Sequence, residues 1–98
     1  MTIFAPAAQA ARFQALRDEL RFLLITSQAR VIETDMPPAA AVQTHAEGVW
    51  MEVKPSVEPK CVRCWHLRSD VGSDPHHPEL CARCVVNIDG PGEERKFA

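Results

Sequence analysis

Two matched cysteine motifs near the end of the chain constrain its fold more than any other feature. Cys61-Val-Arg-Cys64 and Cys81-Ala-Arg-Cys84 each have the spacing C-x2-C, and sixteen residues separate them. A C-x2-C turn aims two sulfurs at one point, and a loop of this length can fold back to bring in the second pair. The spacing therefore predicts that Cys61, Cys64, Cys81 and Cys84 bind one structural Zn²⁺ in a tetrahedral site.

The sequence leaves other uses of the same cysteines open. Two disulfides would suit a secreted chain, but the first residues carry neither the basic region nor the long apolar run of a signal peptide. Four thiolates also suit iron, as in a rubredoxin-like electron-transfer protein. A redox-active C-x2-C would not need a second matching pair. Metal binding by thiolates predicts a reducing compartment, the cytoplasm.

Size and charge narrow the class of protein. Ninety-eight residues allow one small domain, or one small domain with a metal module. A formal net charge of −2 and a pI of about 6.0 are not the basic balance of an independent nucleic-acid-binding protein. No apolar stretch approaches the roughly 20 residues that a membrane span needs, so no membrane partner is predicted.

The segment before the cysteines has the pattern of a small α+β element. Residues 7–24 carry a helical period, with an apolar stripe formed by Phe13, Leu16, Leu20, Leu23 and Leu24. Arg21 falls on the polar side of the same helix. Residues 29–34 and 49–54 are typical of short strands, and residues 36–48 are typical of a loop.

These patterns together predict the architecture. The fold class is small α+β: an N-terminal helix with a short two-stranded β element, followed by a four-cysteine zinc knuckle or β-hairpin. The prolines around residues 55–59 mark a boundary. Residues 1–59 are therefore predicted to form one subdomain, and residues 60–98 a zinc-finger module with a C-terminal tail. A module this small has little interior of its own, so Trp65 is expected to cover the sulfurs.

No catalytic residue is predicted. A catalytic zinc keeps one coordination position open for water, and four thiolates leave none. His66, His76 and His77 lie between the cysteine pairs, but a filled tetrahedral site does not need them as ligands. The sequence Gly90-Pro-Gly92 is typical of a turn and does not match a phosphate-binding loop.

Three segments in a fixed order resemble a known family. They are Lys60-Cys-Val-Arg-Cys-Trp-His66, His77-Pro-Glu-Leu-Cys-Ala-Arg-Cys84 and Gly92-Glu-Glu-Arg-Lys-Phe-Ala98. Together they closely resemble the extreme C-terminus of bacterial isoleucyl-tRNA synthetases, and the similarity covers about residues 16–98. The same zinc-finger family includes the C-terminal β-hairpin of formamidopyrimidine-DNA glycosylases.

The resemblance implies a zinc-binding part of isoleucine–tRNA ligase that helps to bind and position the isoleucine tRNA for aminoacylation. The HIGH and KMSKS signatures and the editing domain are absent from this sequence. The resemblance therefore assigns ligase activity, ATP and Mg²⁺ to the parent protein and not to this stretch. It implies two partners, the tRNA and the remainder of the synthetase chain, and a monomeric fragment.

Basic and aromatic residues around the cysteines are the candidates for RNA contact. Guanidinium and ammonium groups bind phosphates, and aromatic rings stack on unpaired bases. The candidates are Arg63, Trp65, His66, Arg68, Arg83, Arg95 and Lys96. Four cations within or beside the cysteine motifs are also placed to offset the thiolate charge: Lys60, Arg63, Arg68 and Arg83. A purely structural module that docks on the synthetase body is the alternative.

Overall fold

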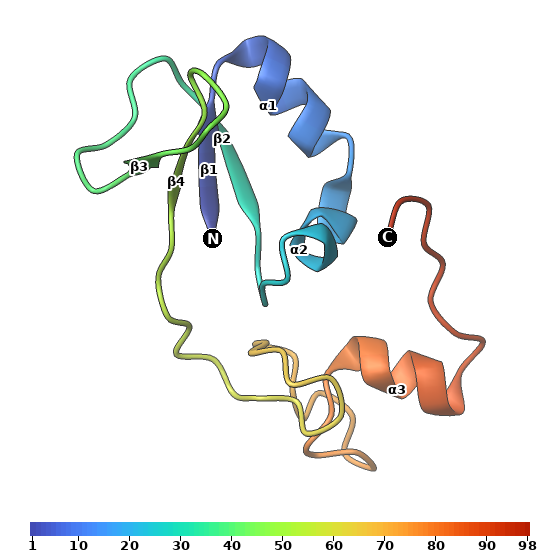
Figure 1. Cartoon of the computed structure of the whole chain (residues 1–98). Helices are drawn as coiled ribbons and strands as arrows, with labels where there is room; N and C mark the ends of the chain where they lie inside the picture. Colours follow the sequence, from blue (N-terminus) through green and yellow to red (C-terminus); the bar gives the residue numbers. More distant parts are fainter. The chain divides into compact units, whose positions relative to one another are not determined.

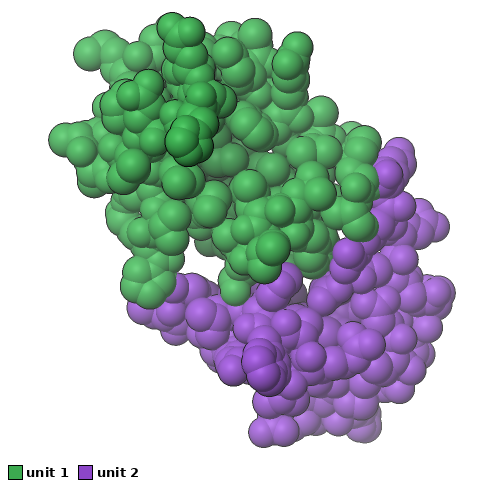
Figure 2. Space-filling model, viewed as in Figure 1, with its two compact units in different colours: residues 1–55, 97–98 green, residues 56–96 purple.

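A computed structural model describes residues 1–98 and contains helices together with one four-stranded sheet (Figure 1). The predicted α+β class is confirmed. The chain divides into two compact units, one formed by residues 1–55 with 97–98 and the other by residues 56–96 (Figure 2). The division into subdomains 1–59 and 60–98 stays a prediction. None of the helices has the length and apolar character needed to span a membrane.

The sheet of the first unit has the strand order β2-β1-β4-β3. Its strands are β1 (Thr2–Ala5), β2 (Arg30–Glu33), β3 (Val42–Gln43) and β4 (Trp50–Glu52). The strands predicted at 29–34 and 49–54 are confirmed as β2 and β4. Strand β1 was not predicted: it lies between them, parallel to β2 and antiparallel to β4 (Figure 1). Strand β3 was not predicted either, because it lies within the predicted loop of residues 36–48.

The helix predicted over residues 7–24 is broken into three pieces. These are α1 (Ala7–Gln14), the 3₁₀ turn η1 (Arg17–Glu19) and α2 (Leu20–Leu23). Arg17 has φ 49°, a left-handed conformation in which a right-handed helix cannot continue. The break changes which side chains face inward. Arg21, expected on the polar side, is only 4% exposed.

The interior of the first unit lies between these helices and the sheet. Its buried residues are Ile3, Ala5, Ala10, Leu20 and Val49, and Phe13, Leu16, Leu24, Ala29 and Val31 pack against them. Most of the predicted apolar stripe is therefore part of this core, whereas Leu23 is 50% exposed. Two residues from the chain end also belong to this unit, because the Glu19 carboxylate accepts hydrogen bonds from the backbone N–H groups of Phe97 and Ala98.

The second unit has a smaller interior. Cys61, Cys81 and Cys84 are buried, with Cys64, Val71 and Leu80 packed against them. The one regular helix here, α3 (Ala82–Asp89), was not predicted and begins directly after Cys81. With so few apolar side chains, the cysteines themselves form the centre of the unit.

Candidate metal centre

The first cysteine pair lies in a tight backbone turn. Lys60 and Leu67 form an isolated β-bridge that closes it. Within the turn, the Cys61 N–H donates to the His66 carbonyl oxygen at 2.9 Å, and the Trp65 N–H donates to the Cys61 carbonyl oxygen at 2.8 Å. Trp65 has φ 67°, which turns the chain back on itself directly after Cys64. This turn holds both sulfurs on its inner side.

The second pair is positioned by the start of α3. Cys81 is the residue that precedes the helix, in extended conformation, and Cys84 lies in the first helical turn. Backbone hydrogen bonds join this region to the preceding loop: Val62 N–H to the Glu79 carbonyl at 3.1 Å, and Gly72 N–H to the Leu80 carbonyl at 3.0 Å. The sixteen-residue loop therefore folds back and brings the two pairs together, as the spacing predicted.

The four sulfurs have the spacing of a tetrahedral metal site. All four Sγ atoms lie within 4.8 Å of one another, and Cys64 Sγ is 3.7 Å from Cys81 Sγ. A zinc–sulfur distance of about 2.3 Å implies about 3.8 Å between two sulfurs of a tetrahedron. A disulfide would require about 2.0 Å, and none of the four cysteines is disulfide-bonded. The arrangement fits a four-thiolate metal ion and excludes the two-disulfide alternative.

The electrostatics of the site also fit a cation. Burial favours the neutral Cys61 thiol, but the backbone N–H groups of Cys64, Cys81 and Arg63 outweigh burial and lower its pKa to about 6. Burial raises the pKa of Cys81 to about 12, and it also raises the pKa of Cys84. Burial therefore favours the neutral thiol at Cys81 and at Cys84. A divalent cation bound among the four sulfurs would stabilise their ionised form.

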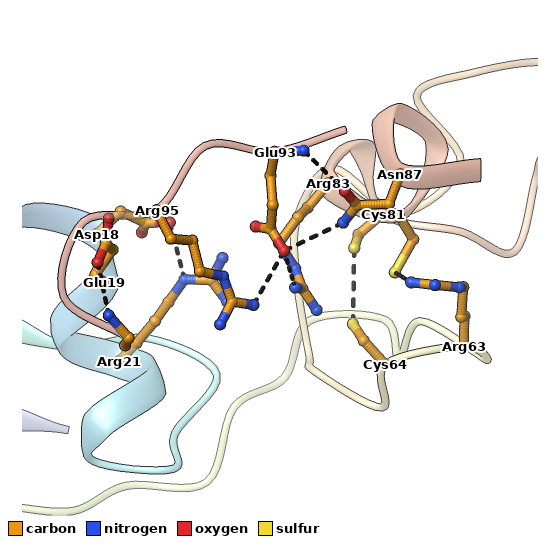
Figure 3. Close-up of polar contacts among 12 residues, drawn as sticks. Asp18, Glu19, Arg21, Arg63, Cys64, Cys81, Arg83, Asn87, Glu93 and Arg95 are labelled. Carbon is orange, nitrogen blue, oxygen red and sulfur yellow. Dashed lines mark hydrogen bonds and ion pairs between the residues drawn. The ribbon is translucent and has the colours of Figure 1, made fainter. Parts of the chain in front are cut away.

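Two arginines approach the sulfurs, one from each C-x2-C motif. Arg63 Nη1 donates to Cys84 Sγ at 3.5 Å (Figure 3). Arg83 Nη1 donates to Glu93 Oε1 at 2.8 Å, and the Cys64 side chain is close enough to affect the pKa of Arg83. Burial acts to lower the pKa of Arg83, but these two acidic neighbours raise it. The interpretation that the cations offset thiolate charge thus has one direct contact in its favour, from Arg63 to Cys84.

The candidates for RNA contact lie in different surroundings. Trp65 is 70% exposed, so the expectation that it covers the sulfurs is wrong. The left-handed turn at Trp65 directs the indole outward, and Lys60 Nζ lies 4.5 Å from its ring centroid. Arg63 and Lys96 are exposed, whereas His66 and Arg68 are half-buried. Arg83 and Arg95 both form ion pairs with Glu93.

Two residues that the sequence patterns did not single out contribute to this region. Lys60 was considered only as a charge beside the motif, although it is the cation that lies over the indole. Glu93 is not among the candidate site residues, although its side chain is only 25% exposed and joins two arginines. Ion pairs that a sequence pattern can predict join residues three or four apart on a helix. Arg83 and Glu93 are ten residues apart, so no local pattern predicts their ion pair.

A comparison with known families finds a similarity within the second unit. Residues 58–86 match the model of a family described as a zinc finger found in FPG and IleRS. The match spans both C-x2-C motifs and the loop between them, and the resemblance drawn from the sequence is confirmed.

The similarity to individual proteins extends over the whole chain. All 98 residues align with "Isoleucine--tRNA ligase" of Aeromonas hydrophila at 51% identity, and with the proteins of the same name from Azotobacter vinelandii at 53% and Colwellia psychrerythraea at 49%. In each case the alignment covers 100% of this chain and 10% of the relative. The chain thus spans about a tenth of the length of the curated relatives that it matches, and it corresponds to their zinc-finger region.

Proposed function

We propose that this chain is the zinc-binding, tRNA-contacting part of an isoleucine–tRNA ligase, and that it helps to position the tRNA for aminoacylation. Support comes from about 50% identity to ligases of that name along the full chain. On this proposal isoleucine, ATP, Mg²⁺ and the catalytic groups belong to the remainder of the ligase, which is in turn a partner of these residues. We also propose that the chain is cytoplasmic and monomeric.

The four cysteines are proposed as the ligands of one Zn²⁺. Zinc supplies a charge-neutralising cross-link between the two cysteine pairs and no open position for chemistry. Around it, the backbone N–H groups that bond to Cys61 hold the first pair in place. Arg63 and Arg83 offset the excess negative charge of four thiolates. Iron would take the same ligands, and the absorption spectrum of the purified protein separates the two metals, because four-thiolate iron absorbs visible light and zinc does not.

The observation that carries the RNA-binding proposal is the exposed indole of Trp65. We define the knuckle surface as Lys60, Val62, Arg63 and Trp65, all of which are exposed. Trp65 is 70% exposed, and the contact of its apolar ring with water is unfavourable in the unbound protein. An unpaired base that stacks on the ring removes this surface from water. The neighbouring Lys60 and Arg63 are placed to bind the phosphates on either side of such a base.

The other candidates are secondary on this proposal. Arg83 is 19% exposed and Arg95 32% exposed, and both share the Glu93 carboxylate. A phosphate would have to compete with that carboxylate for either guanidinium. Arg63 and Trp65 are therefore expected to contribute more to RNA affinity than Arg83 and Arg95 do.

An NMR titration of the zinc-loaded chain with isoleucine tRNA and with a non-cognate tRNA tests the proposal. Amide shifts should concentrate on residues 60–68 and weaken as salt rises. Trp65→Ala should weaken binding by about 5- to 150-fold, which corresponds to the roughly 1–3 kcal/mol that one stacked base contributes. Arg63→Gln should weaken binding and reduce the salt dependence. Arg12→Gln, on an exposed residue of α1, is the control with the same change of charge.

The zinc content of each variant is measured alongside, because Arg63 also contacts Cys84. If neither tRNA shifts any amide of the knuckle surface in well-folded, zinc-loaded protein, the RNA-binding proposal is wrong. Equal affinities for the two tRNAs would retain RNA binding and remove the preference for the isoleucine tRNA.

A structural docking role is the second candidate, and the sheet of the first unit favours it. Its edge strands are β2 and β3, and each carries an exposed apolar side chain, Ile32 at 40% and Val42 at 62% exposure. Unpaired edges with apolar side chains are surfaces that another part of a protein can cover. In the full-length ligase this role predicts that Ile32→Lys and Val42→Lys lower the melting temperature while tRNA affinity stays unchanged.

A further inference from the structure

The turn that follows α2 contains an isoleucine in a backbone conformation that disfavours it. The Ile25 N–H donates to the Phe22 carbonyl oxygen at 3.2 Å. The Thr26 N–H donates to the Arg21 carbonyl oxygen at 2.9 Å. This pair of hydrogen bonds is the Schellman motif that ends many helices, and it places Ile25 where a left-handed residue is needed. Ile25 accordingly has φ 54°, whereas glycine is the usual residue at this position, because it has no Cβ atom to crowd the backbone.

Little packing within the chain offsets this strain. The Ile25 side chain is 89% exposed, so it buries almost no apolar surface. A β-branched residue is among the least suited to a positive φ. The left-handed conformation disfavours folding by roughly 5- to 30-fold in the equilibrium constant. Glycine or asparagine at this position would relieve the strain, so the folding of this chain by itself does not account for the isoleucine.

A second exposed apolar side chain lies two residues earlier in the chain. Leu23 is the last residue of α2, directly before the turn that leads to β2, and it is 50% exposed (Figure 1). We define the α2 turn surface as Leu23 and Ile25. A single exposed apolar side chain is ordinary on a protein surface. Two of them at one helix end, with the backbone of one strained, indicate a contact site.

The lack of charge around the α2 turn surface favours a protein partner over RNA. Residues 22–29 contain no charged side chain, whereas RNA binding depends on cations that contact phosphates. Two exposed aliphatic side chains instead match an apolar protein surface. This chain aligns with only 10% of each ligase that it resembles, so such a surface is available in the remainder of the protein. A partner in the same polypeptide has a high effective concentration, and a small contact then suffices for docking.

We propose that Leu23 and Ile25 dock onto an apolar surface of the ligase outside residues 1–98, and that this contact compensates for the strain at Ile25. Burial of both side chains removes apolar surface from water, which is the stabilisation that the exposed turn lacks. The inference rests on the proposed function, because it takes this chain to be part of a longer ligase. It concerns a different surface from the knuckle surface, so the two proposals can fail separately.

Hydroxyl-radical footprinting of the full-length ligase and of the zinc-loaded 98-residue chain tests the docking directly. The method oxidises side chains according to their exposure, and a free peptide added to both samples calibrates the radical dose. Oxidation of Ile25 should be at least about 5-fold lower in the ligase, because side chains at the centre of an interface are almost fully desolvated. Equal oxidation of Ile25 in the two proteins would overturn the proposal. Protection of Ile25 in the 98-residue chain by tRNA alone would also overturn it, since the surface would then bind RNA.

Ile25→Asn should have opposite effects in the two proteins. In the 98-residue chain, the unfolding equilibrium constant of residues 1–55 should fall by about 5-fold, because asparagine tolerates a left-handed backbone and little packing is lost. In the ligase, amide hydrogen exchange of residues 20–30 should be about 10-fold faster, the lower end of the effect of one buried Ile side chain. Val57→Asn is the matched control, because Val57 is also β-branched, is 99% exposed and lies outside the α2 turn surface. It should change either value by less than about 2-fold.

The outcomes separate this inference from the RNA-binding proposal. A larger unfolding constant for Ile25→Asn in the 98-residue chain would show that Ile25 is already packed within it, which contradicts the inference. Unchanged exchange of residues 20–30 in the Ile25→Asn ligase would contradict it as well. If either result appears while tRNA still shifts the amides of residues 60–68, only the docking inference fails. If Ile25 is protected in the ligase while tRNA shifts none of those amides, only the RNA-binding proposal fails.

Discussion

Gly72 lies so close to Pro78 that a Cβ atom on Gly72 would be 2.9 Å from the Pro78 carbonyl oxygen. The same glycine has φ 82°, a backbone conformation that residues with a side chain rarely adopt. The loop between the cysteine pairs closes at this contact, where the Gly72 N–H bonds to the Leu80 carbonyl directly before Cys81. The sixteen-residue connection depends on a close backbone approach that leaves no space for a methyl group.

Gly72→Ala should therefore lower the free energy of unfolding of zinc-loaded residues 56–96 by roughly 2–4 kcal/mol, through strain in φ and through overpacking. Gly92→Ala is the matched control. It has φ 90°, but its nearest atom, Asn87 Oδ1, is 3.8 Å from the added Cβ. It should cost only about 1–2 kcal/mol. Urea unfolding of the zinc-loaded variants measures both values, and equal losses would show that the contact with Pro78 is unimportant.

Metal removal should unfold the two units unequally. The cysteines are the centre of the second unit, whereas the core of the first unit contains no cysteine. The binding free energy of a structural zinc, on the order of 10 kcal/mol, is then folding free energy for residues 56–96 alone. After chelation, amide signals of residues 61–84 should collapse to unfolded positions while those of β1 stay dispersed. Persistent dispersion in residues 61–84 would contradict a metal-dependent fold.

Arg21→Ala should destabilise the first unit by roughly 1–3 kcal/mol. The side chain is 4% exposed, pairs with Asp18 at 3.0 Å and lies over the Phe22 ring at 4.2 Å, so truncation removes packing as well as charge. Arg12→Ala, on exposed α1 surface, should change stability by less than about 0.5 kcal/mol. Hydrogen exchange of β1 amides measures the difference, and equal effects of the two changes would count against a structural role for Arg21.

The contribution of Glu93 to folding stability should be lost in acid. Burial acts to raise its pKa, but hydrogen bonds from Arg95, Asn87 and Arg83 outweigh burial and hold the pKa below the ordinary value of 4.5. A carboxyl with a lowered folded-state pKa stabilises the fold fully above its unfolded-state pKa. That contribution is lost as pH falls through the lowered value.

The stability advantage of the parent chain over Glu93→Gln should accordingly be constant near neutral pH and shrink below about pH 4.5. Acid also protonates the thiolates and releases zinc from both chains. The difference between the two chains at each pH is therefore the quantity to measure. A stability advantage that grows as the pH falls below 4.5 would contradict a lowered pKa of Glu93 in the folded state.

Short-range patterns in the sequence were sufficient to predict several parts of the structure. The C-x2-C motifs placed four cysteines together, because each motif fixes two sulfurs in one turn and the loop length permits closure. The strands at residues 30–33 and 50–52 followed from β-branched and alternating residues. The family resemblance rested on the same motifs with their neighbours, and the match over residues 58–86 confirmed it.

Tertiary structure alone decided the remaining features, since each depends on contacts or dihedral angles that no local pattern encodes. Strand β1 is four residues long and gains its place by pairing with segments that begin near residues 30 and 50. Left-handed residues at Arg17 and Trp65 broke the predicted helix and turned the indole outward. Glu93 reaches Arg83 only because the chain doubles back after α3. The sequence by itself determined the cysteine cluster, and long-range packing decided what surrounds it.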